Sequence, residues 1–246
     1  MTEALYGRNP VYETLRAGRR RVQAVHVARG VEREGRVAEI LELAESQGIQ
    51  VKRVERSELH ETVGNAQGVT AATNGYPYAA LADLLQATTS GQPPLYLLLD
   101  IIQDPQNLGT LLRTAEAVGV TGVILPYRRT ATVTPAVVSA SSGACEHLLI
   151  AQENVARAIE ELKQHDVWIT GLDADPGATP LPDADLAGAI GLVVGSEGEG
   201  MRRLVRESCD FLVRIPMRGR VESLNAAVAG SVMLYSIWAA RGYPAP

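Results

Sequence analysis

From Leu95 onward, short aliphatic runs alternate with segments of helical periodicity. Nearly continuous apolar runs are typical of strands buried on both faces, and the amphipathic segments between them supply the covering helices. This alternation predicts a parallel α/β sheet. The expected strands are Leu95–Ile102, Thr121–Leu125, His147–Ile150, Val167–Leu172, Ile190–Gly195 and Phe211–Ile215, and the expected helices are Leu108–Val118, Val155–Gln164, Met201–Ser208 and Leu224–Ala239.

A smaller α/β unit precedes this sheet. Its expected elements are strands at Val22–Ala28, Ile49–Val54 and Gly68–Ala72 and a helix at Glu34–Gln47. Turn-forming residues then gather in Thr73–Tyr78 and Thr88–Pro94. The chain has 246 residues, so we expect two domains, at residues 1–75 and 95–246, joined by a linker over 76–94.

Composition excludes several classes of protein. With 46% hydrophobic and 21% charged residues, the chain is neither collagen-like, nor of low complexity, nor wholly disordered. Two cysteines cannot form a disulfide framework, and the four histidines lack metal-ligand spacing, so no metal is expected. The N-terminus lacks the apolar segment of a secretory signal. The expected location is therefore the cytoplasm.

The segment Ser223–Ala240 carries no charge over 18 residues, which is the lower limit for a membrane-spanning helix. It contains polar residues, among them Asn225, Ser231 and Ser236. A helix that is apolar on most sides is more simply a buried one. We therefore expect it in a domain core or a subunit interface, and we expect no membrane span.

The net charge of −5 argues against a chain that binds polyanions over its whole surface. Residues 1–75 nevertheless hold 11 basic and 10 acidic side chains, whereas residues 76–246 hold 12 and 18. Four arginines gather near the N-terminus, at Arg16, Arg19, Arg20 and Arg21. They permit a local nucleic-acid contact, although solvated surface arginines explain them equally well.

Three loops lie at the carboxyl edge of the expected parallel sheet, where ligands bind in such folds. They are Gln103–Asn107, Gly195–Gly200 and Pro216–Asn225. In the first loop, Asn107 is a candidate N-cap of the following helix, and Arg113 lies off the buried stripe of that helix. The two side chains could meet an anion together. Alternatively, Arg113 is a surface residue paired with Glu116.

The second loop, VVGSEGEGM, has neither dinucleotide-binding nor P-loop spacing, and Glu197 and Glu199 would repel a phosphate. Glycines beside carboxylates suit a neutral or cationic ligand, such as a nucleoside or a sulfonium, although a tight turn with solvated glutamates is the simpler explanation. In the third loop, Ser223 is a candidate helix cap. Two classes remain: an enzyme with a nucleoside-like cofactor, and a module that binds small molecules or RNA without chemistry.

Taken together, DPQNLGTLLRTAEAVG, LVVGSEGEGM and IPMRGRVESLN resemble, in this order, the three motifs of the SpoU family of RNA ribose 2'-O-methyltransferases. This family belongs to the knotted SPOUT superfamily. SASSGACEHL, which contains Cys145, is similar to a further family stretch, and YGRNPVYETLR resembles the start of the family's substrate-binding domain. The resemblance is closest to the bacterial 23S rRNA (guanosine-2'-O-)-methyltransferase branch.

This resemblance implies a small L30e-like N-terminal α/β domain and a C-terminal parallel-sheet SPOUT domain with a deep trefoil knot. It also implies S-adenosyl-L-methionine in the knot, a homodimer with sites near the interface, and 2'-O-methylation of a guanosine in 23S rRNA or a ribosomal precursor. The implied catalytic residues are Asn107, Arg113, Glu197, Ser223 and Asn225. The implied cofactor-binding residues are Gly195, Glu197, Gly198, Gly200, Ile215, Met217, Ser223 and Leu224.

The resemblance leaves other substrates open: a tRNA, another rRNA site, or an RNA that a catalytically silent relative only binds. In the family, Arg113 is the expected activating residue, but a guanidinium stays protonated at neutral pH and is a poor base. We therefore expect Arg113 to hold an RNA phosphate and to polarise the 2'-hydroxyl. The N-terminal arginines would bind RNA phosphates. Methyl transfer of this kind needs no metal.

Overall fold

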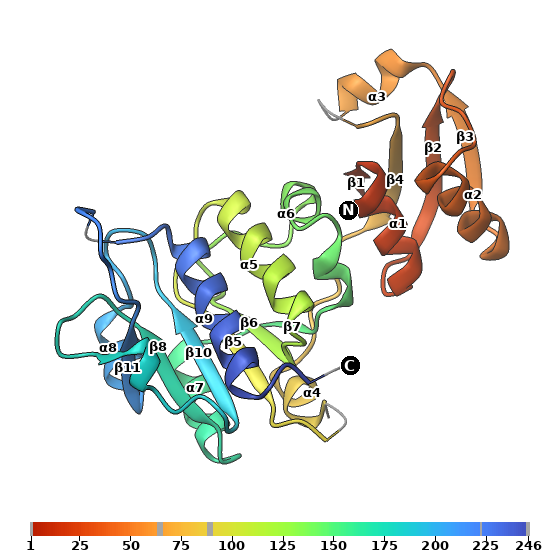
Figure 1. Ribbon diagram of the computed structural model, residues 1–246. Coiled ribbons are helices and arrows are strands. Elements are labelled where there is room, and N and C mark those ends of the chain that lie inside the picture. Colours follow the sequence, from red (N-terminus) through yellow and green to blue (C-terminus); the bar gives the residue numbers. More distant parts are fainter. Residues whose placement is uncertain (1, 63–65, 88–90, 222, 245–246) are drawn as a thin grey trace. The chain divides into compact units, whose positions relative to one another are not determined.

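The computed structural model describes residues 2–62, 66–87, 91–221 and 223–244 (Figure 1). The chain forms two compact units. The first comprises Met1–Pro77 together with Val133–His147, and the second comprises Tyr78–Thr132 together with Leu148–Pro246. The chain therefore passes between the units at three points, after residues 77, 132 and 147.

The first unit is built on a four-stranded sheet. Its strands, in spatial order, are β1 (Thr2–Tyr6), β4 (Val69–Asn74), β2 (Val22–Ala28) and β3 (Gln50–Val54). Pairing is parallel between β2 and β3 and antiparallel elsewhere. The helices are α1 (Arg8–Ala17), α2 (Arg36–Ser46) and α3 (Arg56–Thr62). The strands and helix expected within residues 22–72 are thus confirmed, and β1, α1 and α3 are additional.

Helices α1 and α2 enclose the core of this unit against the sheet. Val11 and Leu15 of α1 pack with Ile40 of α2 and Val25 of β2 in one apolar cluster. Helix α1 ends at Gly18, whose φ of 63° lies in the left-handed region that glycine adopts without a Cβ penalty. An aliphatic core of this kind agrees with the low aromatic content of the chain.

The segment Val133–His147 belongs to the first unit although it lies far along the chain. It forms α6 (Pro135–Ala140) and the 3₁₀ helix η1 (Ala144–His147), which pack against α1 and β1. The strand expected at His147–Ile150 is corrected by this arrangement, because His147 ends η1 and strand β7 runs over Ile150–Gln152. The apolar residues that follow His147 suggested a strand from this position, but His147 is the last residue of a 3₁₀ turn.

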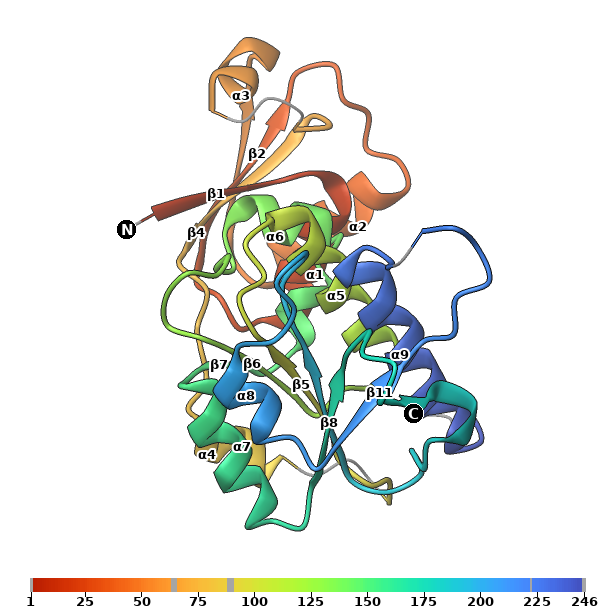
Figure 2. The same cartoon turned by 90° about the vertical axis from the view of Figure 1, so that its left-hand side faces the viewer.

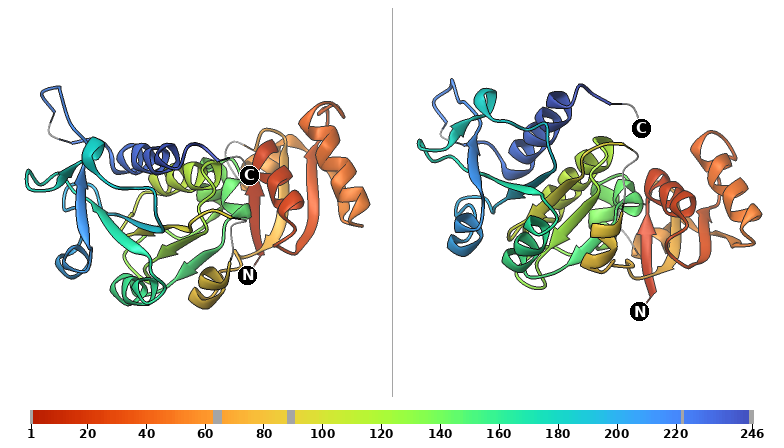
Figure 3. Two further views of the ribbon diagram at one scale, coloured as in Figure 1. Left: turned by 60° about the horizontal axis from the view of Figure 1, so that its bottom comes forward. Right: turned by 90° about the horizontal axis from the view of Figure 1, so that it is seen from below.

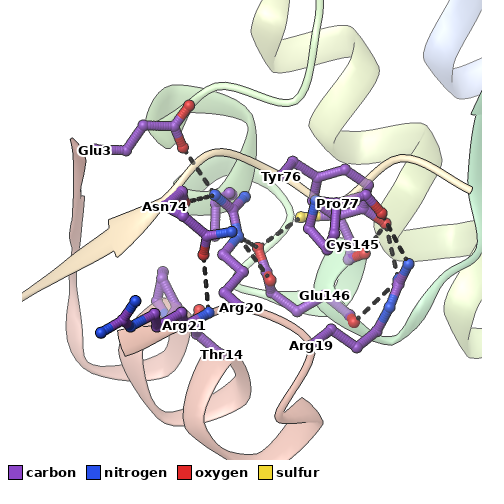
Figure 4. A network of polar contacts seen from close by, with 12 residues as sticks. Glu3, Thr14, Arg19, Arg20, Arg21, Asn74, Tyr76, Pro77, Cys145 and Glu146 are labelled. Carbon is purple, nitrogen blue, oxygen red and sulfur yellow. Dashed lines mark hydrogen bonds and ion pairs between the residues drawn. The ribbon is translucent and has the colours of Figure 1, made fainter. Parts of the chain in front are cut away.

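A buried ionic network holds this segment to the N-terminal chain (Figure 4). The side chains of Arg20 and Glu146 are both 0% exposed, and Arg20 Nε donates to both carboxylate oxygens of Glu146 at 3.0 Å. Arg20 Nη1 also donates to Glu3 Oε2 at 2.7 Å and to the Asn74 carbonyl at 3.1 Å. Desolvation of two charges is offset here by close pairing and by additional hydrogen bonds.

Arg19 extends the same network. Its guanidinium donates to the Tyr76 hydroxyl at 3.0 Å and to the Pro77 carbonyl at 3.2 Å, and the Tyr76 hydroxyl donates to the Cys145 carbonyl at 3.1 Å. Burial raises the pKa of the Cys145 thiol to about 12, so this cysteine stays protonated. Of the arginines expected to meet RNA, Arg20 is withdrawn into the interior and Arg19 is held by these bonds.

The second unit contains a seven-stranded sheet in which every pair is parallel. This confirms the expected fold class. In spatial order the strands are β7 (Ile150–Gln152), β6 (Gly122–Leu125), β5 (Leu95–Leu99), β10 (Ile190–Val194), β8 (Trp168–Leu172), β11 (Phe211–Arg214) and β9 (Thr179–Pro180).

Helices cover both faces of this sheet (Figure 3). One face carries α5 (Pro105–Ala117) and α9 (Ala226–Ala240), and the other carries α4 (Leu81–Gln86), α7 (Val155–Lys163) and α8 (Arg203–Glu207); a short 3₁₀ helix, η2, spans Leu181–Asp183. Residues 76–94, expected as a linker, include α4, whose Leu84 is fully buried against the sheet.

Helices α5 and α9 run side by side (Figure 2). A Cβ on Gly230 would lie 2.6 Å from a Leu111 methyl carbon, so glycine allows this close approach. The Thr114 and Ser231 hydroxyls also lie 2.9 Å apart across the helix pair. Helix α9 is thus buried on one side, as the sequence predicts. Within the described residues, no helix is long and apolar enough to cross a membrane.

The strand order places a topological switch point between β5 and β10. From β5 the chain continues through α5 to β6 and β7 on one side, whereas β10, β8 and β11 lie on the other. In parallel sheets, ligands bind beyond the carboxyl ends of the strands at this point. The strand order is consistent with the expected trefoil knot, which stays a prediction.

We predict that Arg20→Met strongly destabilises the protein, because it leaves the Glu146 carboxylate buried without its cation. Breaking a buried pair in this way costs about 3–5 kcal/mol. Arg16→Met is the matched control, because the ion pair of Arg16 with Glu13 is exposed and such pairs contribute about 0–1 kcal/mol. Urea unfolding measures both values. Equal stability of the two variants would contradict the anchoring role of Arg20.

Candidate active site

Three residues from the three expected loops meet beyond the carboxyl ends of the strands. Asn107 lies in the first turns of α5, Glu197 lies in the loop after β10, and Asn225 begins α9. The Asn107 side-chain amide donates to Glu197 Oε1 at 2.8 Å, and the Asn225 amide donates to the same oxygen and, at 3.1 Å, to Asn107 Oδ1. We call these residues the Asn–Glu–Asn cluster.

Asn225 has two roles in this cluster. Its Oδ1 accepts hydrogen bonds from the Ala227 and Val228 amides at 2.9 and 3.2 Å, which makes it the N-cap of α9. Its Nδ2 then points away from the helix toward Glu197. The caps suggested by the sequence are corrected here, because Asn225 rather than Ser223 caps α9 and Asp104 rather than Asn107 caps α5. Asn107 is thereby available for the cluster.

The loop after β10 is closed on itself. The Ser196 amide donates to the Gly200 carbonyl at 3.0 Å, and the Gly200 amide donates to the Ser196 carbonyl at 3.1 Å. Gly198 and Gly200 have φ values of 86° and 68°, in the left-handed region. A Cβ on Gly195 would lie 2.3 Å from the Gly200 carbonyl carbon, so only glycine fits there. The loop geometry therefore depends on these glycines.

An ion pair that sequence reasoning missed ties this loop to β5. Asp100, which is 0% exposed, accepts hydrogen bonds from the Arg202 amide and from Arg202 Nε, both at 2.8 Å. Its own amide donates to the Val194 carbonyl at 2.8 Å. A charged residue directly after the apolar run of β5 is the signal that could have revealed this contact. The pair sets the position of the loop that carries Glu197.

A cavity of about 560 Å³ opens beside the Asn–Glu–Asn cluster. Its lining comes from the second and third loops and from the segment Leu172–Pro176 at the end of β8. All eight residues that the sequence assigns to cofactor binding line it, namely Gly195, Glu197, Gly198, Gly200, Ile215, Met217, Ser223 and Leu224. We call this space the first cavity.

The charge of the first cavity is mostly negative. Glu197, Glu199, Asp173 and Asp175 line it, and the one lining cation, Arg206, is paired with Asp173 at 2.7 Å and with Asp175 at 2.8 Å. Such walls disfavour a phosphate and favour a neutral or cationic ligand. A nucleoside that carries a sulfonium and an ammonium group fits this set of donors and charges.

Arg113 is the candidate catalytic arginine, and it is not part of the Asn–Glu–Asn cluster. It is exposed on α5, and it lines neither the first cavity nor a second one nearby. The structure thus brings Asn107, Glu197, Ser223 and Asn225 to one edge of the sheet and leaves Arg113 farther along α5. Among the described residues, no group of three or more histidine, cysteine, aspartate or glutamate side chains could hold a metal ion.

Comparison with known protein families accounts for this arrangement. The profile of the SpoU rRNA Methylase family matches residues 94–235, and the profile for RNA 2'-O ribose methyltransferase substrate binding matches residues 4–79. The chain belongs to the SpoU methylase family. The resemblance carried by the three loop motifs is thereby confirmed at the level of the family.

Several relatives of this SpoU methylase match nearly its whole length. It is 41% identical to a Bacillus subtilis (strain 168) protein named as a TrmH family tRNA/rRNA methyltransferase, with 96% of this chain and 94% of the relative covered. It is 44% identical to a Mycobacterium sp. (strain KMS) protein named as a tRNA/rRNA methyltransferase, with 96% and 76% covered.

Solved structures share the fold. The SpoU methyltransferase AviRb from Streptomyces viridochromogenes, in complex with AdoMet, has a TM-score of 0.82 at 23% identity, with 99% of this chain and 92% of AviRb covered. A TrmH family protein from Porphyromonas gingivalis has a TM-score of 0.75 at 25% identity, with 96% and 89% covered.

S-adenosylmethionine is the methyl donor of the SpoU family, and the acidic first cavity fits its positive charge.

We predict that Gly195→Ala lowers the affinity for S-adenosylmethionine about tenfold to hundredfold, because overpacking of this kind costs about 1–3 kcal/mol and displaces the loop. Gly188→Ala is the matched control. Its added Cβ meets no atom within 4 Å, and Gly188 does not line the first cavity, so affinity should stay close to that of the unaltered protein. Isothermal titration calorimetry measures both. Equal losses would show that loop closure does not shape the cavity.

Proposed function

We propose that this SpoU methylase transfers a methyl group from S-adenosylmethionine to a ribose 2'-hydroxyl, in a guanosine of 23S rRNA or of a ribosomal precursor. The convergence of Asn107, Glu197 and Asn225 at the mouth of the acidic first cavity is the observation that carries this proposal. The Asn–Glu–Asn cluster brings together one residue from each of the three family motifs. Family membership does not identify the methylated atom or the RNA, so the ribose 2'-hydroxyl and the rRNA target are what we propose.

The residues of the first cavity would hold the cofactor. Backbone at Gly195, Ile215 and Leu224 would contact its nucleoside, and the Glu197 carboxylate would balance its positive charge. When bound, S-adenosylmethionine supplies an electrophilic methyl group on a sulfonium. The chain contributes alignment, since two groups held in reacting geometry behave as parts of one molecule. Ser223, which is exposed and lines the cavity, would orient the incoming ribose.

Arg113 would act on the RNA rather than as a base. Its guanidinium offers a planar set of donors that matches a phosphate, and it stays protonated at neutral pH. Held beside the target, it would fix the neighbouring phosphate and polarise the 2'-hydroxyl. The proton would then leave to solvent or to the phosphate.

A homodimer is part of the proposal. Val228, Val232 and Tyr235 of α9 are 47, 38 and 45% exposed, and they follow one another at helical spacing. Met217 and Leu224, which line the first cavity, are also partly exposed. An apolar strip that begins at the site suits a second copy of the chain. Light scattering of the protein as it leaves a size-exclusion column measures whether the dimer forms.

The N-terminal unit would bind the RNA. Of the four arginines expected there, Arg16 and Arg21 are exposed, and they are the ones that we assign to phosphate contacts. Residues 4–79 match a substrate-binding profile, which supports this assignment. Deletion of residues 1–75 does not test it cleanly, because the deletion would strip α6 and η1 of their partners in the first unit.

A tRNA is the second candidate substrate. The relatives from Bacillus and Mycobacterium are named as tRNA/rRNA methyltransferases, which covers both kinds of RNA. Another rRNA site is the third candidate, and a relative that binds RNA without methylating it is the fourth. Intact Asn107, Arg113, Glu197 and Asn225 argue against the last.

The deciding experiment follows labelled methyl transfer from S-adenosylmethionine to total rRNA and total tRNA of a strain that lacks the gene. The position of the 2'-O-methyl group is then mapped. One ribose-methylated guanosine in large-subunit rRNA supports the proposal in full. Label in tRNA retains the reaction and replaces the substrate. No transfer to either RNA or to ribosomal precursor particles, with cofactor bound, would overturn the proposal.

We predict that Arg113→Lys lowers kcat/KM for RNA more than about tenfold, because lysine keeps the charge but loses the paired donors of the guanidinium. Cofactor affinity should be unchanged, since Arg113 does not line the first cavity. Steady-state methylation assays and calorimetry provide the two measurements. Nearly full activity of the lysine variant would exclude the phosphate-clamp role.

We predict that Arg16→Glu with Arg21→Glu weakens RNA binding and flattens its dependence on salt concentration. Each lost phosphate contact should lower the slope of log K against log salt by about one. Arg33→Glu is the control, since Arg33 is an exposed arginine paired with Glu45 and absent from the expected RNA surface. Filter binding across a salt series measures the slopes. Identical slopes for all the proteins would place the RNA elsewhere.

A further inference from the structure

A second cavity of about 400 Å³ lies next to the first, at the switch point between β5 and β10. Its walls come from the chain segments that follow these two strands. The lining residues are Ile101, Ile102, Gln103, Asp104 and Asn107 on one side and Ser196, Glu197 and Glu199 on the other. The last three also line the first cavity. The two spaces therefore share a wall, which is the loop that carries Glu197.

The floor of the second cavity contains a strained residue. Ile101 has a φ of 64°, a left-handed conformation that is rare for a β-branched side chain. Such strain persists where the surrounding structure imposes it, and the residue before Ile101 is the buried Asp100, which Arg202 holds in place. Ile101 and the largely buried Ile102 form the apolar part of the lining, against which a flat aromatic ring can pack.

Half of the polar side chains that line this cavity, those of Asp104, Glu197 and Glu199, are carboxylates. The Glu197 carboxylate already accepts hydrogen bonds from Asn107 and Asn225. Asp104 Oδ1 accepts from the Gln106 amide. By contrast, no hydrogen bond or ion pair joins the Glu199 carboxylate to any residue that the structure describes. None of the eight lining residues is a cation.

This chemistry excludes an RNA phosphate from the second cavity and suits a group that offers N–H donors. An ionised carboxylate only accepts hydrogen bonds. Among the bases, guanine offers adjacent N1–H and N2–H₂ donors on its Watson–Crick edge, a match for one carboxylate. Uracil offers a single N–H between two carbonyls. Enzymes that act on RNA commonly read such an edge on a base that is out of its stack.

We propose that the second cavity receives the base of the nucleotide whose ribose is methylated, and that Glu199 selects guanine by accepting its N1–H and N2–H₂ donors. The inference rests on the proposed function, since it places the ribose at the shared wall and the cofactor beyond it. Gln103 would contribute the amide donor that the guanine O6 needs. Glu199 is thus a specificity-determining residue of the same site.

The first test identifies the methylated nucleoside. Total rRNA and tRNA from a strain that lacks the gene are methylated with labelled S-adenosylmethionine, digested to nucleosides and separated. Label in 2'-O-methylguanosine alone is the expected result. Label in the adenosine, cytidine or uridine product would overturn the inference and leave the methyltransferase proposal standing. No label in any product, with cofactor bound, would overturn both.

The second test changes the acceptor. In Glu199→Gln the side chain keeps its size but loses its charge, and kcat/KM should fall about tenfold to hundredfold, the loss expected from one good base contact of about 1–3 kcal/mol. Glu116→Gln is the matched control, because Glu116 is exposed on α5 and lines neither cavity. Calorimetry with S-adenosylmethionine shows whether the Glu199 variant still binds the cofactor.

A third test changes the substrate and the protein together. The target guanosine is replaced with inosine, which lacks the N2 amino group, in a transcript that spans the mapped site. The unaltered protein should lose about tenfold in kcat/KM on this change, and Glu199→Gln should lose little more. Equal losses in both proteins would show that Glu199 does not contact the N2 amino group. That result would overturn the assignment of Glu199 while methylation itself continued.

Discussion

The Asp100–Arg202 pair is the interaction on which both cavities depend. Asp100 lies at the carboxyl end of β5 and is fully buried, and its carboxylate holds Arg202 at the far end of the loop that follows β10. Arg202 is half exposed, so it is the removal of Arg202 that would leave a buried charge, that of Asp100, without its cation. Because the pair joins two neighbouring strands beyond their ends, it sets the separation of their loops. The shared wall of the two cavities follows from that separation.

Much of the fold could be predicted from the sequence because the strands of the second unit are buried on both faces. Runs such as Leu95–Leu99 and Ile190–Val194 have no exposed face, so their apolar character is unbroken. The first strand of the chain, Thr2–Tyr6, is buried only in part and shows no such run. The strand expected at His147–Ile150 was displaced for a related reason, since a 3₁₀ turn has no periodicity long enough to recognise.

The assignment of residues 133–147 to the first unit could not be predicted. It depends on the pairing of Arg20 with Glu146, two residues 126 positions apart. Local pattern predicts surface positions for both, because arginine and glutamate are rarely buried unless they are paired. The same pairing explains why the four neighbouring arginines have different surroundings. The loops of the site were easier to predict, since glycines, carboxylates and asparagines at a strand end are unusual in sequence as well as in space.

The charge distribution of the second unit separates the tasks of the proposed reaction. Carboxylates line both cavities, which suits a cationic cofactor and a base that offers N–H donors. The same carboxylates repel the phosphates on either side of the target nucleotide. In the proposed reaction, arginines that bind those phosphates would therefore lie outside the cavities, and Arg113 lines neither of them. An arginine that lined a cavity would face Glu197 and Glu199, and ion pairing with these carboxylates would compete with its binding to an RNA phosphate.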